Sequence, residues 1–313
     1  MIRGWRKGLV IALGLGLVGS APLMFAYASG YEIDRVYRSL VALWVNAIAI
    51  GYVIGLPMFQ RLAADVERLA PLMEPPERSR ARSALSDAWS NPGVWVARIL
   101  GVVYGLIPST PEVLDAITGR RQSLLYLWVP LLIPILWAIV LPALWRLIRL
   151  SVFVYRLGRD SVRIDLGDLR SLGAFADIGI RHLLIIVVGL SVIPMQAILT
   201  GSLELIDFVP PLIVTAPVAL IVLILPMWGI HRAVAAAKAR ELDRLTTSLS
   251  QMERDGERFL LLSMYRRQIA DVPEWPVSAG SASRVLFYVV IPPLAWVAAA
   301  LVQNLVSNVL GLR

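Results

Sequence analysis

Six apolar segments, each long enough to cross a bilayer as a helix, constrain this chain more than any other feature. A hydrocarbon core about 30 Å thick takes about 20 apolar residues in helical conformation. The six segments are 8–28, 40–59, 124–147, 183–200, 211–230 and 285–306. The composition agrees, because 58% of the 313 residues are hydrophobic, 17% are charged and the mean hydropathy is +0.70. An ordinary soluble domain has about 25% charged residues, so a soluble fold is nearly excluded.

A seventh, shorter segment balances the charges across the membrane. Cytoplasmic loops carry an excess of Lys and Arg, but six spans would place the arginine-rich segments 148–181 and 231–284 outside. A further crossing at 94–108 leaves 24 of the 30 basic residues inside and five outside, with Arg98 within the span. This segment measures only about 22 Å as a helix. A re-entrant or interfacial segment is therefore the alternative.

The sequence predicts an all-α polytopic membrane protein with about seven transmembrane helices, of which 94–108 is marginal. We expect it in the inner (cell) membrane, with a cytoplasmic N-terminus and an outer C-terminus. Residues 1–230 would hold the first six spans and the basic cytoplasmic loops 60–91 and 148–181, and residues 285–313 the last span. These loops are expected to meet anionic headgroups of the bilayer. The positive-inside bias accounts for most of the net charge of +8, so nucleic acid is not an expected partner.

Between the sixth and seventh spans, residues 231–284 have the pattern of a cytoplasmic helical hairpin. Apolar residues recur there in steps of three and four, as in the seam of a coiled coil. The seam consists of Leu242, Leu245, Leu249, Met252 and Phe259. Gly256 takes the missing position, and Asp255 with Gly256 is a turn signal that reverses the chain. The seam predicts packing within one chain, with an intersubunit coiled coil in a homo-oligomer as the alternative.

Few polar residues in the spans are candidates for a transport pathway. No Asp or Glu lies in a span interior, which argues against proton relays and sodium sites. Arg98 either extends to the inner headgroups or faces an aqueous path. Asn46 and Gln196, near mid-span, either form interhelical hydrogen bonds or line a polar path. Glu204 and Asp207 flank a short outer loop, where they either cap helices or form an acidic ring at a pore mouth.

Two GxxxG pairs indicate close helix packing. Gly51 and Gly55 lie on the second span, and Gly101 and Gly105 lie on the marginal third. Glycine lets the backbones of two helices approach each other, which bulkier residues prevent. The second pair favours a crossing over an interfacial position for 94–108.

Signatures of enzymes and of bound metals are absent from the sequence. It has no Cys, and its two histidines, His182 and His231, are expected to be interfacial anchors at span ends. Asp160, Asp165 and Asp168 match no ligand spacing, and we expect them to pair with neighbouring arginines. Neither a metal ion nor a cofactor is expected, and no catalytic motif is present. Phosphoryl or lipid chemistry at the membrane surface is the one enzymatic alternative.

These features predict an oligomeric channel or channel-like transporter, with a pathway through proline-kinked helices and the hairpin as an assembly or gating element. The alternative is a membrane-anchored signalling or scaffold protein that recruits a soluble partner through the hairpin. A channel predicts a polar stripe through the bundle. A scaffold predicts a dry bundle and an exposed apolar seam around Leu245 and Leu249.

Overall fold

The computed structural model describes most of the chain between residues 91 and 275. The described residues are 91–118, 127–162, 164–190, 205–252 and 256–275, scattered positions between Val10 and Ser83, and Ser283 and Phe287. Within them the chain is almost entirely helical and contains no strand. Three helices in this part are long and apolar enough to cross a membrane. The predicted class, a helical protein suited to a membrane, is therefore confirmed.

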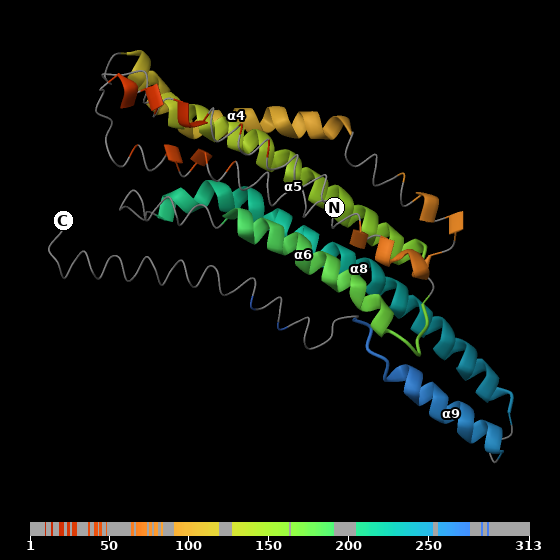
Figure 1. Cartoon of the computed structure of the whole chain (residues 1–313). Coiled ribbons are helices and arrows are strands. Elements are labelled where there is room, and N and C mark those ends of the chain that lie inside the picture. Colours follow the sequence, from red (N-terminus) through yellow and green to blue (C-terminus); the bar gives the residue numbers. More distant parts are fainter. Residues whose placement is uncertain are drawn as a thin grey trace.

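Helices α4 (Pro92–Ile117) and α5 (Trp128–Asp160) form an antiparallel pair (Figure 1). Helix α4 begins after Asn91, whose Oδ1 accepts a hydrogen bond of 2.7 Å from the backbone N of Gly93. It has 26 residues, so it extends beyond the predicted 94–108 at both ends. Its apolar part is Pro92–Ile107. Buried Ser109 lies within the helix, and its hydroxyl is satisfied there because it donates to the Gly105 carbonyl oxygen at 2.9 Å.

Glycines in α4 bring its backbone against that of α5. A Cβ atom added to Gly101 would lie 2.2 Å from the carbonyl oxygen of Trp137, and one added to Gly105 would lie 2.5 Å from Cα of Pro134. Both obstacles are backbone atoms, which cannot turn aside as a flexible side chain can. The close approach of α4 and α5 therefore requires glycine at both positions.

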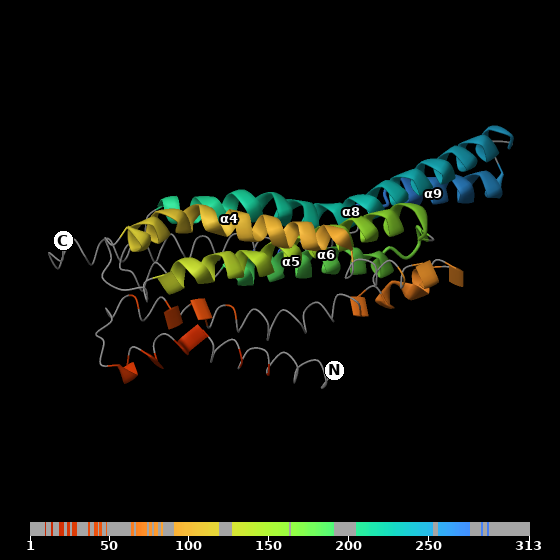
Figure 2. The ribbon, with the colours of Figure 1, turned by 90° about the horizontal axis from the view of Figure 1, so that it is seen from above.

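A second group of helices packs on α5. Helix α6 (Gly173–Leu190) follows a single 3₁₀ turn, η3 (Arg170–Leu172), and the 46-residue α8 (Leu205–Ser250) lies beside both α5 and α6. Helix α6 begins ten residues before the predicted span 183–200, because apolar residues at its start, among them Phe175 and Ile178, already pack into the core. Figure 2 shows α4, α5, α6 and α8 running along one another.

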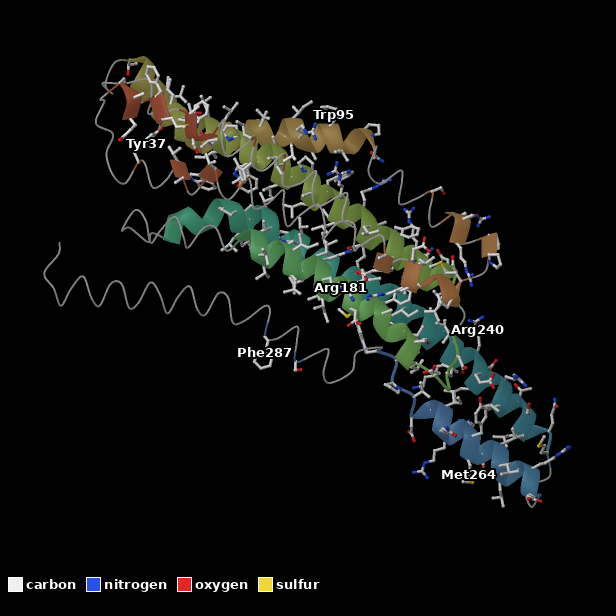
Figure 3. All side chains as sticks on the ribbon, in the orientation of Figure 1. Tyr37, Trp95, Arg181, Arg240, Met264 and Phe287 are labelled. Carbon is white, nitrogen blue, oxygen red and sulfur yellow. The ribbon has the colours of Figure 1, made fainter. Side chains whose placement is uncertain are left out.

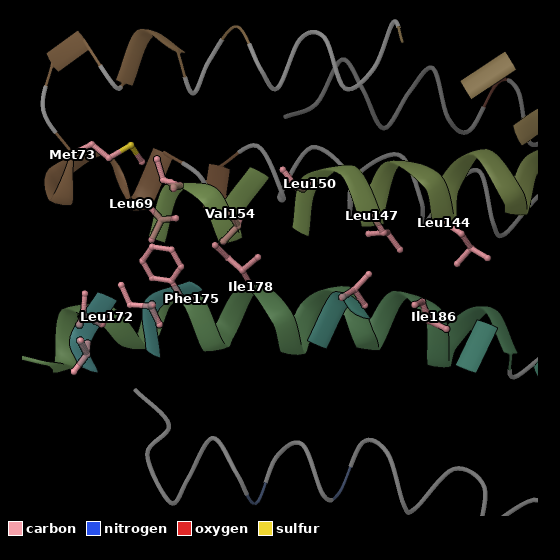
Figure 4. Packing of buried hydrophobic residues seen from close by; sticks show 14 residues of the cluster. Leu69, Met73, Leu144, Leu147, Leu150, Val154, Leu172, Phe175, Ile178 and Ile186 are labelled. Atoms are coloured by element: carbon pink, nitrogen blue, oxygen red, sulfur yellow. The ribbon is translucent and has the colours of Figure 1, made fainter. Parts of the chain in front are cut away.

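One apolar core joins α5, α6 and α8 to a segment far away in sequence. Phe175 of α6 is fully buried, and it points toward Leu69 and Val154 (Figure 4). The segment around Leu69 contains the turn η1 (Ala70–Leu72), and Met73 then forms an isolated antiparallel bridge with Val162. After this bridge, Ile164, Leu166 and Leu169 pack against the same core, so the described part of the chain before α6 covers the core without forming a strand.

Helix α9 (Glu257–Ala270) runs back along the final part of α8. Figures 1 and 2 show that this hairpin extends beyond the ends of α5 and α6, in the direction of the long α8. The bundle and the hairpin are therefore connected by one uninterrupted helix.

Gly101→Ala tests the α4–α5 contact. The added Cβ would force the helices apart, and overpacking of this kind costs about 1–3 kcal/mol. We expect a lower midpoint of thermal unfolding for the detergent-solubilised variant. Gly189→Ala is the matched control, because a Cβ there meets nothing within 4 Å. An equal effect of both substitutions would contradict the contact.

Candidate functional site

The predicted apolar seam lies between α8 and α9 of the same chain. Leu245 is buried, and Leu242, Leu249, Met252 and Phe259 are half-buried. Nε of Arg266 on α9 donates a hydrogen bond of 3.2 Å to Oγ1 of Thr246 on α8, which fixes the register of the pair. The seam around Leu245 is therefore not the exposed surface that a scaffold was expected to present.

Contacts at the end of α9 hold the chain against α8. Nζ of Lys238 donates a hydrogen bond of 2.9 Å to the Val272 carbonyl oxygen and lies 3.7 Å from Oε1 of Glu274. Nδ1 of His231 donates to the Glu274 carbonyl oxygen at 3.2 Å. The His231 ring also stacks on Trp275, with ring centroids 4.3 Å apart. These contacts fix the orientation of α9 relative to the bundle.

The side of α9 that faces away from α8 is apolar at its centre. Leu260 and Leu261 are each 60% exposed and Met264 is 70% exposed. We call these three residues the α9 outer face; Figure 3 labels Met264 on it. Exposed Arg258 and Arg267 flank it on the two sides of the helix. The seam pattern gave no indication of this face, although three successive leucines at 260–262 cover a wider arc than one partner helix can bury.

A hydrogen-bonded polar pair lies inside the bundle, between α5 and α6. Oγ of Ser151 and Nδ1 of His182 are 2.8 Å apart, and both side chains are fully buried. Nε2 of His182 is also buried and has no hydrogen-bond partner within the described part of the chain. The prediction that His182 is an interfacial anchor is wrong. Helix α6 starts earlier than expected, so His182 lies in its middle and its side chain is buried in the core.

A second buried polar contact joins α6 to the segment before η1. Asp65 is 3% exposed and forms ion pairs with Arg181 and, at 3.3 Å, with Arg68. Burial raises the pKa of the Asp65 carboxyl, although the two guanidinium groups act in the opposite direction. Figure 3 labels Arg181 near the middle of the molecule. The sequence offers no signal for this pair, because its members are 116 positions apart.

The remaining predicted site residues have separate locations. Arg98 is exposed on α4, with Cζ 4.6 Å from the ring centroid of Trp95, so it is not in the core. Asp160 pairs with Arg159 at 2.7 Å, and Asp165 accepts a hydrogen bond from Gly167 N at 2.8 Å. Asp207 lies in the first turn of α8, where the structure describes the backbone but not the side chain. Other candidates lie outside the described residues: Asn46, Gly51, Gly55, Gln196 and Glu204.

Asp65→Asn tests the buried ion pair through its pH dependence. The pKa of Asp65 is higher in the folded protein than its ordinary 3.8, so the folded state loses stability as the pH rises through the folded pKa. The variant cannot ionise. We expect its unfolding midpoint, relative to that of the wild type, to rise as the pH increases above the ordinary pKa of 3.8. Asp243→Asn, on an exposed part of α8, is the control; a pH-independent difference for Asp65→Asn would contradict the burial.

No protein-family model matches the chain, and no curated protein or solved structure matches it significantly. Its function must therefore follow from its own residues. Two arrangements stand out among those described: the α9 outer face at the tip of the hairpin, and the Ser151–His182 pair inside the bundle.

Proposed function

We propose that this protein is a membrane-anchored docking protein that holds a soluble partner at the cytoplasmic face through the α9 outer face. The observation that carries the proposal is the exposure of Leu260, Leu261 and Met264, by 60–70%, on α9, which packs against the end of α8. Helix α8 is itself continuous with the bundle. Full burial of one such side chain contributes about 1.5–3 kcal/mol. A partner that covers all three would therefore gain substantial affinity from a small contact.

The charges around the α9 outer face favour an acidic partner. Arg258 and Arg267 flank the apolar residues, whereas Glu257 is the one acidic residue of α9. An amphipathic helix that lays an apolar stripe on a matching surface is a common form of peptide recognition. Such a helix with Asp or Glu beside its stripe would complement both arginines. We therefore assign the partner to this chemical class.

A second copy of the chain fits the α9 outer face less well. Two copies in one membrane have the same orientation, and the hairpin continues the direction of the bundle helices (Figure 1). Their α9 helices would pair in parallel, which brings each Arg267 close to its equivalent and like charges together. The homo-oligomer expected from the sequence would accordingly use another surface.

The proposed topology keeps the seven spans and the inner membrane inferred from the charge distribution, with the hairpin in the cytoplasm. The packing of α4 supports its crossing. A Cβ at Gly93 would meet Trp145, and one at Gly105 would meet Pro134, so α4 runs antiparallel to α5 over this whole stretch. The apolar part of α4, Pro92–Ile107, measures only about 24 Å, so its crossing is proposed from this packing against α5 and not from its length.

Site-specific photo-crosslinking in intact cells tests the docking proposal. A photoreactive amino acid at position 264 should crosslink to a soluble protein, within an amphipathic helix that carries acidic residues. The double substitution Leu260→Glu and Leu261→Glu should reduce this product at least about tenfold, because it removes apolar contact and adds negative charge. The control places the photoreactive group at the exposed position 247 of α8. Crosslinks to a second copy or to lipid alone, or equal products from both positions, would overturn the proposal.

The channel or channel-like transporter expected from the sequence is the second candidate, and the Ser151–His182 pair favours it. A buried ionisable residue in a membrane helix is a candidate for a transport pathway. The other buried hydroxyls in the described bundle, Ser109 and Thr215, bond to carbonyl oxygens of their own helices. Nε2 of His182 has no partner among the described residues, as is also true of Nε1 of Trp145 and Oδ2 of Asp65. Of these atoms, the imidazole nitrogen can either donate or accept a hydrogen bond, depending on the tautomer.

Ion flux in proteoliposomes tests this second function. If the pathway passes His182, the wild type should conduct ions and His182→Leu should lose the flux while the protein remains folded and monodisperse. His231→Leu is the matched control, because the other histidine packs against Trp275 outside the core. Wild-type protein that conducts nothing, or His182→Leu that conducts as well as wild type, would exclude a pathway at this pair.

A further inference from the structure

Two arginines from different helices converge on Tyr155, where α5 crosses α8. Cζ of Arg159 on α5 lies 5.7 Å from the ring centroid of Tyr155, and Arg232 on α8 lies beside the same side chain. The crossing is close because a Cβ at Gly229 would lie 2.3 Å from the Tyr155 carbonyl oxygen. Glycine on α8 therefore brings Arg232 within reach of a side chain on α5.

This cluster is positively charged and open to solvent. Arg159 bonds to the adjacent Asp160 through Nε and Nη2, at 2.7 and 3.1 Å. Arg232 has no carboxylate partner among the residues that the structure describes, and Arg156 adds a third exposed guanidinium nearby. Among the described residues, Asp160 interacts with both Arg159 and Arg156, so one carboxylate is set against three arginines. A planar guanidinium donates two parallel hydrogen bonds to a phosphate, so the cluster has the chemistry of a phosphate site.

An exposed apolar strip on α8 leads to the cluster. Ile221, Ile224 and Trp228 precede Arg232 in steps of three and four residues, which places all four on one side of the helix. The three apolar side chains are 41–45% exposed. Tryptophan is enriched at the headgroup level of membranes, and Trp228 lies one turn before Arg232. The apolar strip and the arginines therefore follow each other along α8 in the same order as the acyl chain and the phosphate of a phospholipid.

We infer that Arg159 and Arg232, together with Tyr155, bind the phosphate of an anionic glycerophospholipid, whose acyl chain lies on Ile221, Ile224 and Trp228. The lipid belongs to the leaflet on the hairpin side of the membrane. A free phosphate would meet the same guanidinium groups but would leave the apolar strip uncovered. The site is independent of the α9 outer face, so the docking proposal can fail while this one holds.

Lipid-dependent stabilisation of the full-length protein in detergent tests the site. The probes are phosphatidylglycerol, phosphatidylcholine and inorganic phosphate; the readouts are the unfolding midpoint and lipid adducts in native mass spectrometry. We expect phosphatidylglycerol alone to stabilise the wild type. Arg232→Gln and Arg159→Gln should each raise the half-saturating concentration of phosphatidylglycerol about tenfold. Arg232→Lys should have an intermediate effect, because lysine keeps the positive charge but lacks the two parallel N–H donors of a guanidinium.

Arg240→Gln is the matched control, because it removes the same charge from an exposed position of α8 two turns away (Figure 3). It should leave the half-saturating concentration within about twofold of wild type. An equal loss in Arg240→Gln would overturn the site in favour of general surface charge. Equal stabilisation by phosphatidylcholine would overturn the role of the arginines, and equal stabilisation by inorganic phosphate would replace the lipid by a free anion.

Discussion

Close backbone contact between helices at glycine is the constraint on which the rest of this structure depends. Helix α5 is held from two sides: Gly101 and Gly105 of α4 abut Trp137 and Pro134, and Gly229 of α8 abuts Tyr155. Inside a bilayer, helices gain little from apolar burial alone, so short interaxial distances and good packing supply much of the attraction between them. A side chain at any of these glycines would separate the helices and remove the polar contacts that form between them.

The polar groups inside the bundle follow from that packing. The α5–α6 contact brings Ser151 and His182 to 2.8 Å, and the segment around Leu69 brings Asp65 to Arg181 beside the same core. Buried polar groups are costly unless they are bonded, and each of these has one partner in the described chain. Nε2 of His182 and Oδ2 of Asp65 still have no hydrogen-bond partner among the described residues. His182 lies inside the bundle, which makes it the natural starting point for any transport hypothesis.

Helix α8 connects the core of the bundle, the proposed lipid site and the α9 outer face. Its first half packs in the core through Val222 and Ile230, its middle carries Arg232 beside Tyr155, and its end supports α9. A lipid phosphate bound at the middle would fix the depth of α8 in the membrane, while Lys238 holds the end of α9 at a set orientation. A partner on the α9 outer face would then be held at a defined distance from the bilayer, since a helix is a stiff spacer.

The sequence by itself determined the helical class, the fit to a membrane and the existence of a hairpin after the apolar segment 211–230. These follow from residue hydrophobicity, segment length and turn residues, all of which are local properties of the chain. Tertiary structure decided which helix faces pack against each other and which side chains stay exposed. Leu245 is covered by α9 while Met264 is exposed, His182 is buried instead of anchoring at the membrane surface, and Asp65 meets Arg181 across 116 positions. Hydrophobic periodicity marks which residues share a helix face, but it does not say which other helix covers that face. That choice depends on the shapes and distances of surfaces that come together only when the chain has folded.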